Sequence, residues 1–413
     1  MTRAREDAPG MTTTRPVTRP ADTADTGGTG HTADTGDTSH PADTADTAHP
    51  AHPAHPGDTA HTEALEADLL DGFFDDPPTV PPRWFYDETG SLLFDEITRL
   101  DEYYPTRAEA QILRTRAAGI VGDATTVIEL GAGSCEKTRV LLDELAGRAA
   151  GRDAGGSAGR DAGAPTGANA GGEAGRVTGG AAGADVVNGA ADGPRPRFVP
   201  VDISAEMLEE SARALATEYP GLGIEPVVGD LTALDGPLPG EPGRRLVLFL
   251  GGTVGNFTES QRGEFLTMVR GLLAPGDRFA MGFDLVKDPG RLVAAYDDAR
   301  GVTAEFNLNM LDVICRTVDC HGLERRDFRH QSVWNARESR IEMWLRAVRD
   351  VRVEFPTLGL ARTLAAGEGI RTEIARKFEP DVLVAELASH GFTRPTVWRD
   401  EGRDFGMVLV VVE

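Results

Sequence analysis

Residues 126–142 have the sequence TVIELGAGSCEKTRVLL. The apolar residues of TVIEL predict a buried strand, Gly131 and Gly133 predict a tight turn, and a helix is predicted from Ser134 with Lys137 in its first turn. Glycine adopts positive φ and lets a ligand approach the backbone, while free N–H groups at a helix N-terminus face that ligand. The stretch therefore predicts a nucleotide-binding corner, although an ordinary strand-to-helix connection can also contain such glycines.

The acidic residue Glu129 bears on which nucleotide this corner binds. A carboxylate at the end of the strand would repel a diphosphate, and Glu136 stands where the dinucleotide pattern GxGxxG has its third glycine. S-adenosylmethionine carries no phosphate, and its sulfonium and ammonium groups tolerate a nearby carboxylate. Its own carboxylate can meet Lys137. We therefore expect S-adenosylmethionine as the cofactor.

Two stretches have a biased composition without large apolar residues. Residues 1–62 repeat ADT, DTG and AHP units, and residues 147–195 are rich in Gly and Ala. Neither can bury enough apolar surface to offset the entropy of ordering it, so we predict a disordered tail and an unstructured loop. The tail holds six of the nine histidines, His31, His40, His49, His52, His55 and His61. Their spacing is irregular, and we predict no metal site.

Composition also argues against several classes of partner. The formal net charge of −24 would repel nucleic acid and anionic membrane surfaces. The longest apolar runs are strand-sized, so no membrane span is expected. Cys135, Cys315 and Cys320 form no disulfide framework, which favours a reducing, cytoplasmic location. We expect free thiols at Cys315 and Cys320, the alternative being metal ligands with partners that the sequence does not reveal, and a monomer that acts on a small molecule.

A second acidic position has the spacing of a ribose ligand. Asp202 follows a predicted strand, residues 198–201, and lies 22 positions after Gly131 once the 49 residues 147–195 are set aside. In doubly wound folds a carboxylate about 20 residues beyond the glycine turn binds a ribose. Ser204 is predicted to cap the following helix, and Asp202 could also serve only as a cap.

Two further strands end in polar residues at the same edge. Residues 224–228 predict a third strand followed by Asp230 and Leu231, which together suit the exocyclic amine and flat face of adenine. Residues 245–250 predict a fourth strand that continues into GGTVGN, whose glycines let Asn256 project into the cleft, unless Asn256 is simply a turn residue. Ligands of open α/β sheets bind at this edge.

The remaining chain completes an α/β fold. A helix at 260–273 and a strand at 278–285 finish a core of residues 121–285, and a helix and two strands in 378–413 predict the antiparallel edge of a class I, Rossmann-like methyltransferase sheet. Residues 286–377 predict an inserted α+β lobe that binds substrate. Residues 63–120 are expected to form an N-terminal helical segment that contributes to the substrate site.

Several long, collinear motifs resemble a known family. They are WFYDETGSLLFDEITRLDEYYPTRAEAQIL at 84–113, ELGAGSCEKTR, FLGGTVGN, GFDLVKDPGRLVAAYDDA, RIEMWLRA and TEIARKF. They are similar to the L-histidine Nα-methyltransferases of ergothioneine biosynthesis over residues 63–413, apart from the 147–195 loop. The resemblance implies an enzyme that uses S-adenosylmethionine to place three methyl groups on the α-amine of histidine, giving hercynine.

The resemblance also assigns roles to individual residues. The expected donor-binding residues are Gly131, Lys137, Asp202, Asp230 and Leu231. The expected substrate-binding residues are Tyr103 in the histidine pocket, Asn256 and Tyr296 at the carboxylate, and Met343 and Glu373 at the imidazole. Tyr86 is expected beside the reacting amine as a possible proton relay. Each has a plainer alternative: packing for Tyr86 and Tyr103, core filling for Met343, and a solvated charge for Glu373.

One position departs from the family pattern. Ala375 stands where the family usually has a serine that binds the imidazole, and losing that hydrogen bond costs roughly 0.5–1.5 kcal/mol. This leaves room for a methyltransferase of another amino acid or small amine. A binding module without catalysis, which signals through its tail, is the other alternative.

Overall fold

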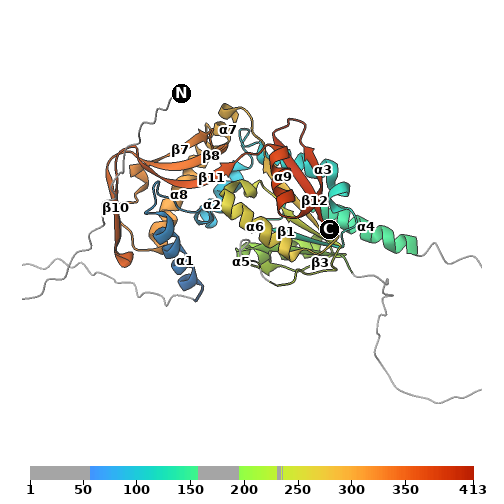
Figure 1. Ribbon diagram of the computed structural model, residues 1–413. Helices are drawn as coiled ribbons and strands as arrows, with labels where there is room; N and C mark the ends of the chain where they lie inside the picture. The colour runs from blue at the N-terminus through green and yellow to red at the C-terminus, as the bar shows by residue number, and fades with distance from the viewer. Residues whose placement is uncertain (1–55, 157–194, 230–233, 235) are drawn as a thin grey trace, which may run out of the picture. The chain divides into compact units, whose positions relative to one another are not determined.

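The computed structural model describes residues 56–156, 195–229, 234 and 236–413 (Figure 1). Eight of the described strands form one sheet with the order β12-β13-β6-β5-β1-β2-β3, and β4 also pairs with β2. All neighbours from β3 to β6 run parallel, whereas β13 is antiparallel to both β6 and β12. This order confirms the predicted class I methyltransferase fold. The strands are β1 (Thr126–Leu130), β2 (Arg197–Asp202), β3 (Gly223–Ile224), β4 (Val227–Val228), β5 (Arg245–Phe249), β6 (Arg278–Asp284), β12 (Phe392–Arg399) and β13 (Phe405–Val412).

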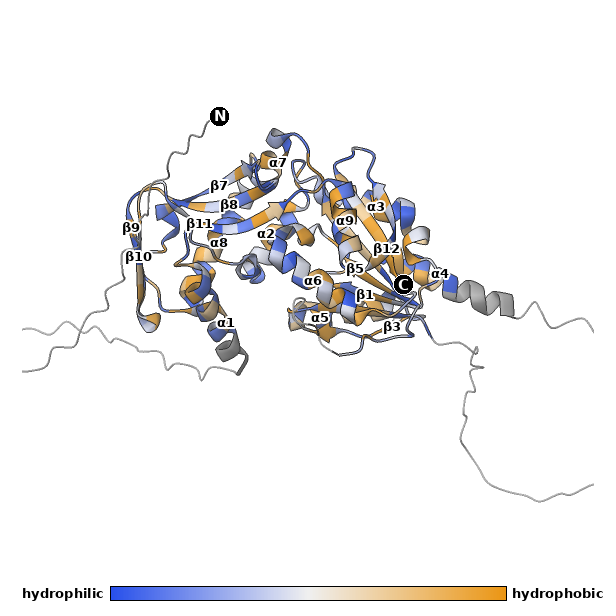
Figure 2. Ribbon diagram, viewed as in Figure 1, coloured by the Kyte–Doolittle hydropathy of each residue, from blue (hydrophilic) through white to orange (hydrophobic). Residues whose placement is uncertain are grey.

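Helices cover both faces of this sheet because its central strands are apolar on both sides (Figure 2). Along β1, Val127 packs with one set of helices and Ile128 with the other. The first face carries α3 (Pro105–Val121), α4 (Arg139–Gly156) and α5 (Ala205–Glu218), and the second carries α6 (Glu259–Leu272) and α9 (Pro380–Ser389). The helix α6 begins with a capping box between Thr258 and Gln261.

A separate hydrophobic core organises the lobe. Its strands form a sheet of order β11-β8-β7 and a hairpin of β9 and β10. The N-terminal segment divides between the two cores, because α1 and α2 pack in the lobe while α3 packs on the central sheet. The lobe elements are α1 (Pro56–Gly72), η1 (Pro82–Phe85), α2 (Glu88–Ile97), α7 (Pro289–Tyr296), α8 (Val302–Thr317), η3 (Arg325–Asp327), β7 (Phe328–Asn335), β8 (Arg340–Ala347), β9 (Val351–Phe355), η4 (Pro356–Leu358), β10 (Leu360–Leu364) and β11 (Gly369–Arg376).

Three predicted boundaries are wrong. The predicted tail, 1–62, overlaps α1, which begins at Pro56 and buries Leu65 and Leu69 one turn apart. Residues 1–55 lie outside the described part of the chain. The predicted loop, 147–195, overlaps α4, which continues to Gly156, and 157–194 are again not described. The single strand predicted at 224–228 is two short strands, because Pro226 between them has no N–H to donate.

The expected free thiols at Cys315 and Cys320 are also wrong, because the two residues form a disulfide. Cys315 lies in the last turn of α8, and the chain leaves that helix and turns back within five residues. The Cα atoms come within 5.3 Å, a normal separation for bonded cysteines. Cys135 is free and buried.

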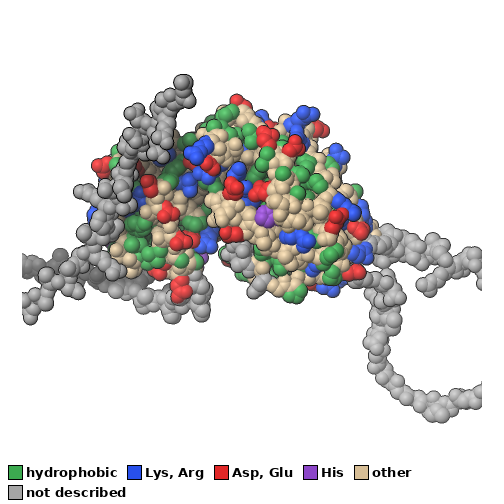
Figure 3. Space-filling view, in the orientation of Figure 1, with side chains coloured by type: hydrophobic (Ala, Val, Ile, Leu, Met, Phe, Trp, Pro, Cys, Tyr) green, Lys and Arg blue, Asp and Glu red, His purple; other side chains and the backbone are tan. Residues whose placement is uncertain are grey.

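The described surface is mixed in character. On the face drawn in Figure 3, Lys and Arg side chains are interspersed with Asp and Glu rather than gathered in one area. No helix among the described residues is long and apolar enough to cross a membrane.

A glycine at the junction of sheet and lobe gives a test of this packing. A Cβ at Gly255, in the 3-10 helix η2 (Thr253–Asn256), would lie 2.7 Å from the carbonyl oxygen of Arg376. We expect Gly255→Ala to lower the free energy of unfolding by about 1–3 kcal/mol, measured by chemical denaturation. The control Gly271→Ala, in α6 with open space around it, should raise stability by about 0.5–1 kcal/mol. Equal stability of Gly255→Ala and the wild type would contradict this packing.

Candidate functional site

The turn after β1 faces open space, as a ligand-binding turn requires. Gly131, Gly133 and Cys135 have φ values of 73°, 51° and 55°, and a Cβ at Gly133 would meet no atom within 4 Å. These left-handed residues prevent a helix from starting at Ser134. The helix α4 begins at Arg139 instead, so the prediction that Lys137 lies in its first turn is wrong. Lys137 belongs to the turn itself.

Asp202 holds this turn from the end of β2. One carboxylate oxygen accepts a hydrogen bond from the Gly133 N–H at 3.0 Å, and the other accepts one from the Ser204 N–H at 3.0 Å. Ser204 is the N-cap residue of α5, but its side chain makes no capping bond. Asp202 therefore holds the backbone just before α5 and remains half-buried beside the turn. Asp230 and Leu231 lie outside the described residues.

A buried carboxylate that sequence reasoning missed connects two of these loops. Glu109 of α3 is fully buried, forms an ion pair of 2.6 Å with Lys137 Nζ, and accepts the Gly251 N–H at 2.8 Å. It thereby ties the turn after β1 to the turn after β5. One sequence signal could have revealed it. Glu109 lies four positions before Leu113 and so on the same face of the helix, and a charged residue on an otherwise apolar face is unusual.

Glu129 is more nearly neutral than the sequence suggested. Its side chain is 3% exposed and accepts a hydrogen bond from Thr138 Oγ1 at 2.6 Å. Burial raises the pKa of this carboxyl to about 8. At neutral pH it is mostly protonated, so repulsion of a diphosphate by Glu129 does not exclude phosphate ligands.

The predicted substrate residues meet in one pocket between the sheet edge and the lobe. Asn256 ends η2, Tyr296 ends α7, and Glu373 lies on β11. Six residues singled out from the sequence line this pocket: Tyr86, Tyr103, Asn256, Tyr296, Met343 and Glu373. Phe94 and Phe306, which were not predicted as site residues, line it too.

Aromatic rings form much of the pocket wall. The centroid of the Tyr86 ring lies 5.7 Å from those of both Phe94 and Phe306, and Tyr103 lies 6.1 Å from Tyr296. The negative faces of such rings attract cations, including methylated ammonium groups. The pocket can therefore accept an amine that gains positive charge as it is methylated.

Glu373 and Met343 face each other across neighbouring strands. They are direct partners in the pairing of β11 with β8, which shifts register between Arg371 and Glu373. Burial raises the pKa of the Glu373 carboxyl to about 7, although the positive charge of Lys377 opposes this rise. Glu373 is therefore poised to be either charged or neutral near physiological pH.

Tyr86 stays protonated near neutral pH. It lines the pocket mouth with 51% of its surface exposed, while burial of its hydroxyl among the pocket walls raises its pKa, with added effects from Glu373 and Asp202. A protonated phenol cannot act as a general base. It can still pass a proton along if its oxygen accepts one while its own proton moves to water.

Ala375 is packed against apolar neighbours rather than lining the pocket. It is 4% exposed and shares a cluster with Tyr104, Leu292, Ala295 and Ile341. Ala295 of this cluster does line the pocket. Because Ala375 lies two residues after Glu373 on β11, a hydroxyl at position 375 would project from the same face of the strand as the Glu373 carboxyl.

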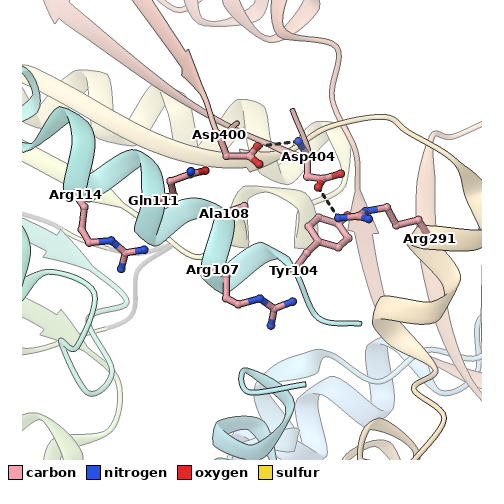
Figure 4. A pocket seen from close by; sticks show the side chains of 8 residues that line it. All are labelled: Tyr104, Arg107, Ala108, Gln111, Arg114, Arg291, Asp400 and Asp404. Carbon is pink, nitrogen blue, oxygen red and sulfur yellow. Dashed lines mark hydrogen bonds and ion pairs between the residues drawn. The ribbon is translucent and has the colours of Figure 1, made fainter. Parts of the chain in front are cut away.

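A second hollow, of about 350 Å³, opens on the surface beside α3 (Figure 4). Its carboxylates already have partners, because Asp400 accepts the Gly402, Asp404 and Phe405 N–H groups and Asp404 pairs with Arg291 at 2.5 Å. None of the residues predicted to bind donor or substrate lines it. We therefore place the candidate site in the pocket at the sheet edge.

Comparison with known proteins identifies the family of this chain. Residues 65–155 and 186–412 match the model of a family described as histidine-specific methyltransferase, SAM-dependent. The chain is 44% identical to the histidine N-alpha-methyltransferase of Mycolicibacterium smegmatis, covering 84% of this chain and 95% of that one. It is 42% identical to the enzyme of the same name from Mycobacterium tuberculosis, covering 84% and 94%. Ergothioneine biosynthesis protein 1 of Neurospora crassa is 26% identical over 81% of this chain and 33% of its own length.

Replacing the buried carboxyl of Glu129 should change how stability depends on pH. Because its folded pKa of about 8 lies above its ordinary value, the folded state binds this proton more tightly, and the stabilisation is lost as pH rises from about 5 to 8. The neutral Glu129→Gln should lose less stability over this range, by at most about 1.4 kcal/mol per pH unit.

Chemical denaturation at several pH values between 5 and 8 would measure this difference. Glu136→Gln removes an exposed carboxylate from the same loop and controls for the change in net charge. Parallel stability curves for the wild type and Glu129→Gln would show that burial does not raise this pKa.

Proposed function

The chain belongs to the family of histidine-specific, S-adenosylmethionine-dependent methyltransferases, and we propose that it methylates the α-amine of L-histidine. Three successive transfers would give hercynine, the first step of ergothioneine biosynthesis. The observation that carries the proposal is the pocket in which Asn256, Tyr296 and Glu373 meet at the carboxyl edge of the sheet.

The donor is proposed to bind across the turn after β1. The fit rests on the open space at Gly133, on the Asp202 carboxylate, and on Lys137, whose ammonium group has three N–H donors. One of these donors meets Glu109, and the 30% exposure of the Lys137 side chain leaves access for a ligand carboxylate. Asp202 would bind the ribose, with Asp230 and Leu231 at the adenine. S-adenosylmethionine supplies an electrophilic methyl group on its sulfonium.

The substrate is proposed to bind through three polar groups. Asn256 and Tyr296 would hold the carboxylate of histidine, and Glu373 would accept the imidazole N–H opposite Met343. An ionised carboxylate in this pocket distinguishes an N–H donor from an apolar side chain. Tyr103 and the other aromatic rings would enclose the substrate from the lobe side.

The chain then has to orient the amine and remove its protons. The neutral α-amine attacks the methyl carbon in line, so that a C–N bond forms as the C–S bond breaks and S-adenosylhomocysteine leaves. Each of the first two products must lose a proton before the next attack. Tyr86 would take this proton on its oxygen while it passes its own proton to a water molecule within the pocket.

Ala375 favours a second candidate within the same reaction class. Without the serine hydroxyl expected at this position, discrimination for imidazole is weaker, and another aromatic amino acid could be the preferred substrate. Incubation of the purified protein with S-adenosylmethionine and individual amino acids, followed by mass spectrometry, separates these candidates. Trimethylation of tryptophan or tyrosine but not histidine would refute the histidine assignment. Tight binding of donor and histidine without any product would indicate a non-catalytic module.

The Glu373 carboxylate should contribute strongly to histidine affinity. Glu373→Gln replaces a charged acceptor by a neutral amide, so we expect KM for histidine to rise about tenfold to a hundredfold with little change in donor affinity. Steady-state kinetics with each substrate varied would measure both. The control Glu401→Gln alters an exposed carboxylate between β12 and β13 and should leave both constants unchanged. An unchanged histidine KM in Glu373→Gln would exclude this contact.

Restoring the serine should improve histidine binding. Ala375→Ser adds one hydroxyl beside the pocket, and we expect affinity for histidine to increase by up to about tenfold. Isothermal titration of L-histidine would measure the gain. Ala361→Ser, on the exposed side of β10, is the matched control. Unchanged or weaker binding in Ala375→Ser would mean that the hydroxyl makes no hydrogen bond to the substrate.

A further inference from the structure

A buried charge network lies directly behind the substrate pocket. Asp284, at the end of β6, is 4% exposed, and Lys377, just after β11, is 2% exposed. Lys377 Nζ lies 2.9 Å from Asp284 Oδ2 and also donates a hydrogen bond of 2.9 Å to the hydroxyl oxygen of Tyr296. Lys377 therefore connects the edge of the sheet to a side chain that lines the pocket.

A second lysine binds the same carboxylate from the other side. Lys287 pairs with Asp284 Oδ1 and donates to the hydroxyl of Tyr104 at 2.6 Å, and that hydroxyl donates to Asp284 Oδ2 at 2.8 Å. Burial disfavours charge on Asp284, yet Lys377 and Lys287 together hold the pKa of its carboxyl below the usual value. The ring of Tyr104 lines the separate surface hollow of Figure 4. The two lysines share Asp284, but the hydrogen bond to Tyr296 comes from Lys377.

The backbone of Tyr296 is fixed independently of this network. His330 Nε2 lies 2.8 Å from the Tyr296 carbonyl oxygen, and His330 Nδ1 lies 2.8 Å from the side-chain amide nitrogen of Asn307. Burial lowers the pKa of His330, so its imidazole is neutral. These contacts imply that Nε2–H donates to the carbonyl while Nδ1 accepts from Asn307. The main chain at Tyr296 is therefore held in place without Lys377. The direction of the Tyr296 O–H bond is not determined by these contacts.

The hydrogen bond from Lys377 sets that direction. The ammonium group has no lone pair, so the Tyr296 oxygen must be the acceptor and its own proton must point elsewhere. Among the described residues, the Tyr296 hydroxyl has no hydrogen-bond partner other than Lys377. Burial raises the pKa of Tyr296 well above its ordinary value, so the proton stays on the oxygen.

We propose that Lys377 is a positioning residue that directs the hydroxyl proton of Tyr296 into the pocket, toward the carboxylate of the amino-acid substrate. This inference rests on the proposed function, which places that carboxylate between Asn256 and Tyr296. Lys377 acts through Tyr296 and touches no reacting atom. Asp284 holds Lys377 in place through their ion pair.

A double-mutant cycle tests the proposal. L-histidine binding is measured by isothermal titration, with S-adenosylhomocysteine present, for the wild type, Lys377→Met, Tyr296→Phe and the double variant. We expect each single variant to bind histidine about tenfold more weakly and the double variant to match Tyr296→Phe within about twofold. Losses that multiply in the double variant would overturn the proposal, because Lys377 would then act independently of the Tyr296 hydroxyl.

Lys287→Met is the matched control. It removes a lysine from the same carboxylate, leaves Asp284 paired with Lys377, and does not touch the Tyr296 hydroxyl. We expect its histidine affinity to stay within about threefold of the wild type, and Lys377→Arg to recover most of the affinity lost in Lys377→Met. A loss in Lys287→Met equal to that in Lys377→Met would mean that any disturbance of Asp284 weakens binding, which also contradicts the proposal.

Folding and function are checked separately. Binding of S-adenosylhomocysteine and thermal unfolding show whether each variant is folded. If Lys377→Met does not fold, the cycle is repeated with Asp284→Asn and Lys377→Met combined, so that no buried carboxylate is left without its partner. A wild type that binds L-histidine but forms no methylated product refutes the proposed function and leaves the cycle measurable. A wild type that does not bind L-histidine refutes both.

Discussion

The ion pair between Asp284 and Lys377 closes the stem of the inserted lobe. The chain leaves the sheet after Asp284 and returns at Phe378, and the Phe378 N–H donates to the Asp284 carbonyl oxygen at 2.8 Å. Leu285 and Phe378 form a parallel bridge at the same place. A buried charge is costly unless it is paired and hydrogen-bonded. Asp284 and Lys377 are therefore stable there only while the segment that leaves the sheet and the segment that returns to it stay together. The lobe is thereby held in register with the sheet edge, where the pocket lies.

Glu109 plays the corresponding part on the other side of the site. It comes from α3, and it reaches both the turn that carries Lys137 and the turn that leads to Asn256. Gly282 of β6 makes room for it, because a Cβ there would lie 2.2 Å from Glu109 Oε1. One carboxylate thus fixes the spacing between the proposed donor-binding turn and the proposed substrate-binding turn. In-line transfer depends on such a fixed spacing, since small displacements of the reactants are costly.

The sequence was sufficient to locate the parallel strands and their carboxyl edge, because apolar runs of strand length followed by polar residues mark that edge of an open sheet. Asp202 and Asn256 follow from that pattern. The roles of Glu109 and Lys377 could not be predicted in this way, because their partners are distant in the sequence. Glu109 binds residues 28 and 142 positions away, and Lys377 binds residues 81 and 93 positions away. The delayed start of α4 was also hidden, since Cys135 adopts a left-handed conformation that its residue type does not favour. Family resemblance, rather than residue pattern, supplied Met343 and Glu373.

Whether each buried carboxyl near the pocket is charged depends on whether a lysine is paired with it. Glu129, buried in β1, and Glu373, which lines the pocket, have carboxyl pKa values raised by burial to about 8 and 7, whereas Asp284 stays ionised beside two lysines. A substrate that donates a hydrogen bond to Glu373 favours its ionised form and so lowers that pKa. Binding of such a substrate is therefore linked to proton release, and the free energy needed to charge Glu373 is subtracted from its affinity. A ligand without an N–H donor at that position leaves Glu373 neutral and incurs no such cost, so the raised pKa reduces the preference for imidazole that an ionised Glu373 provides.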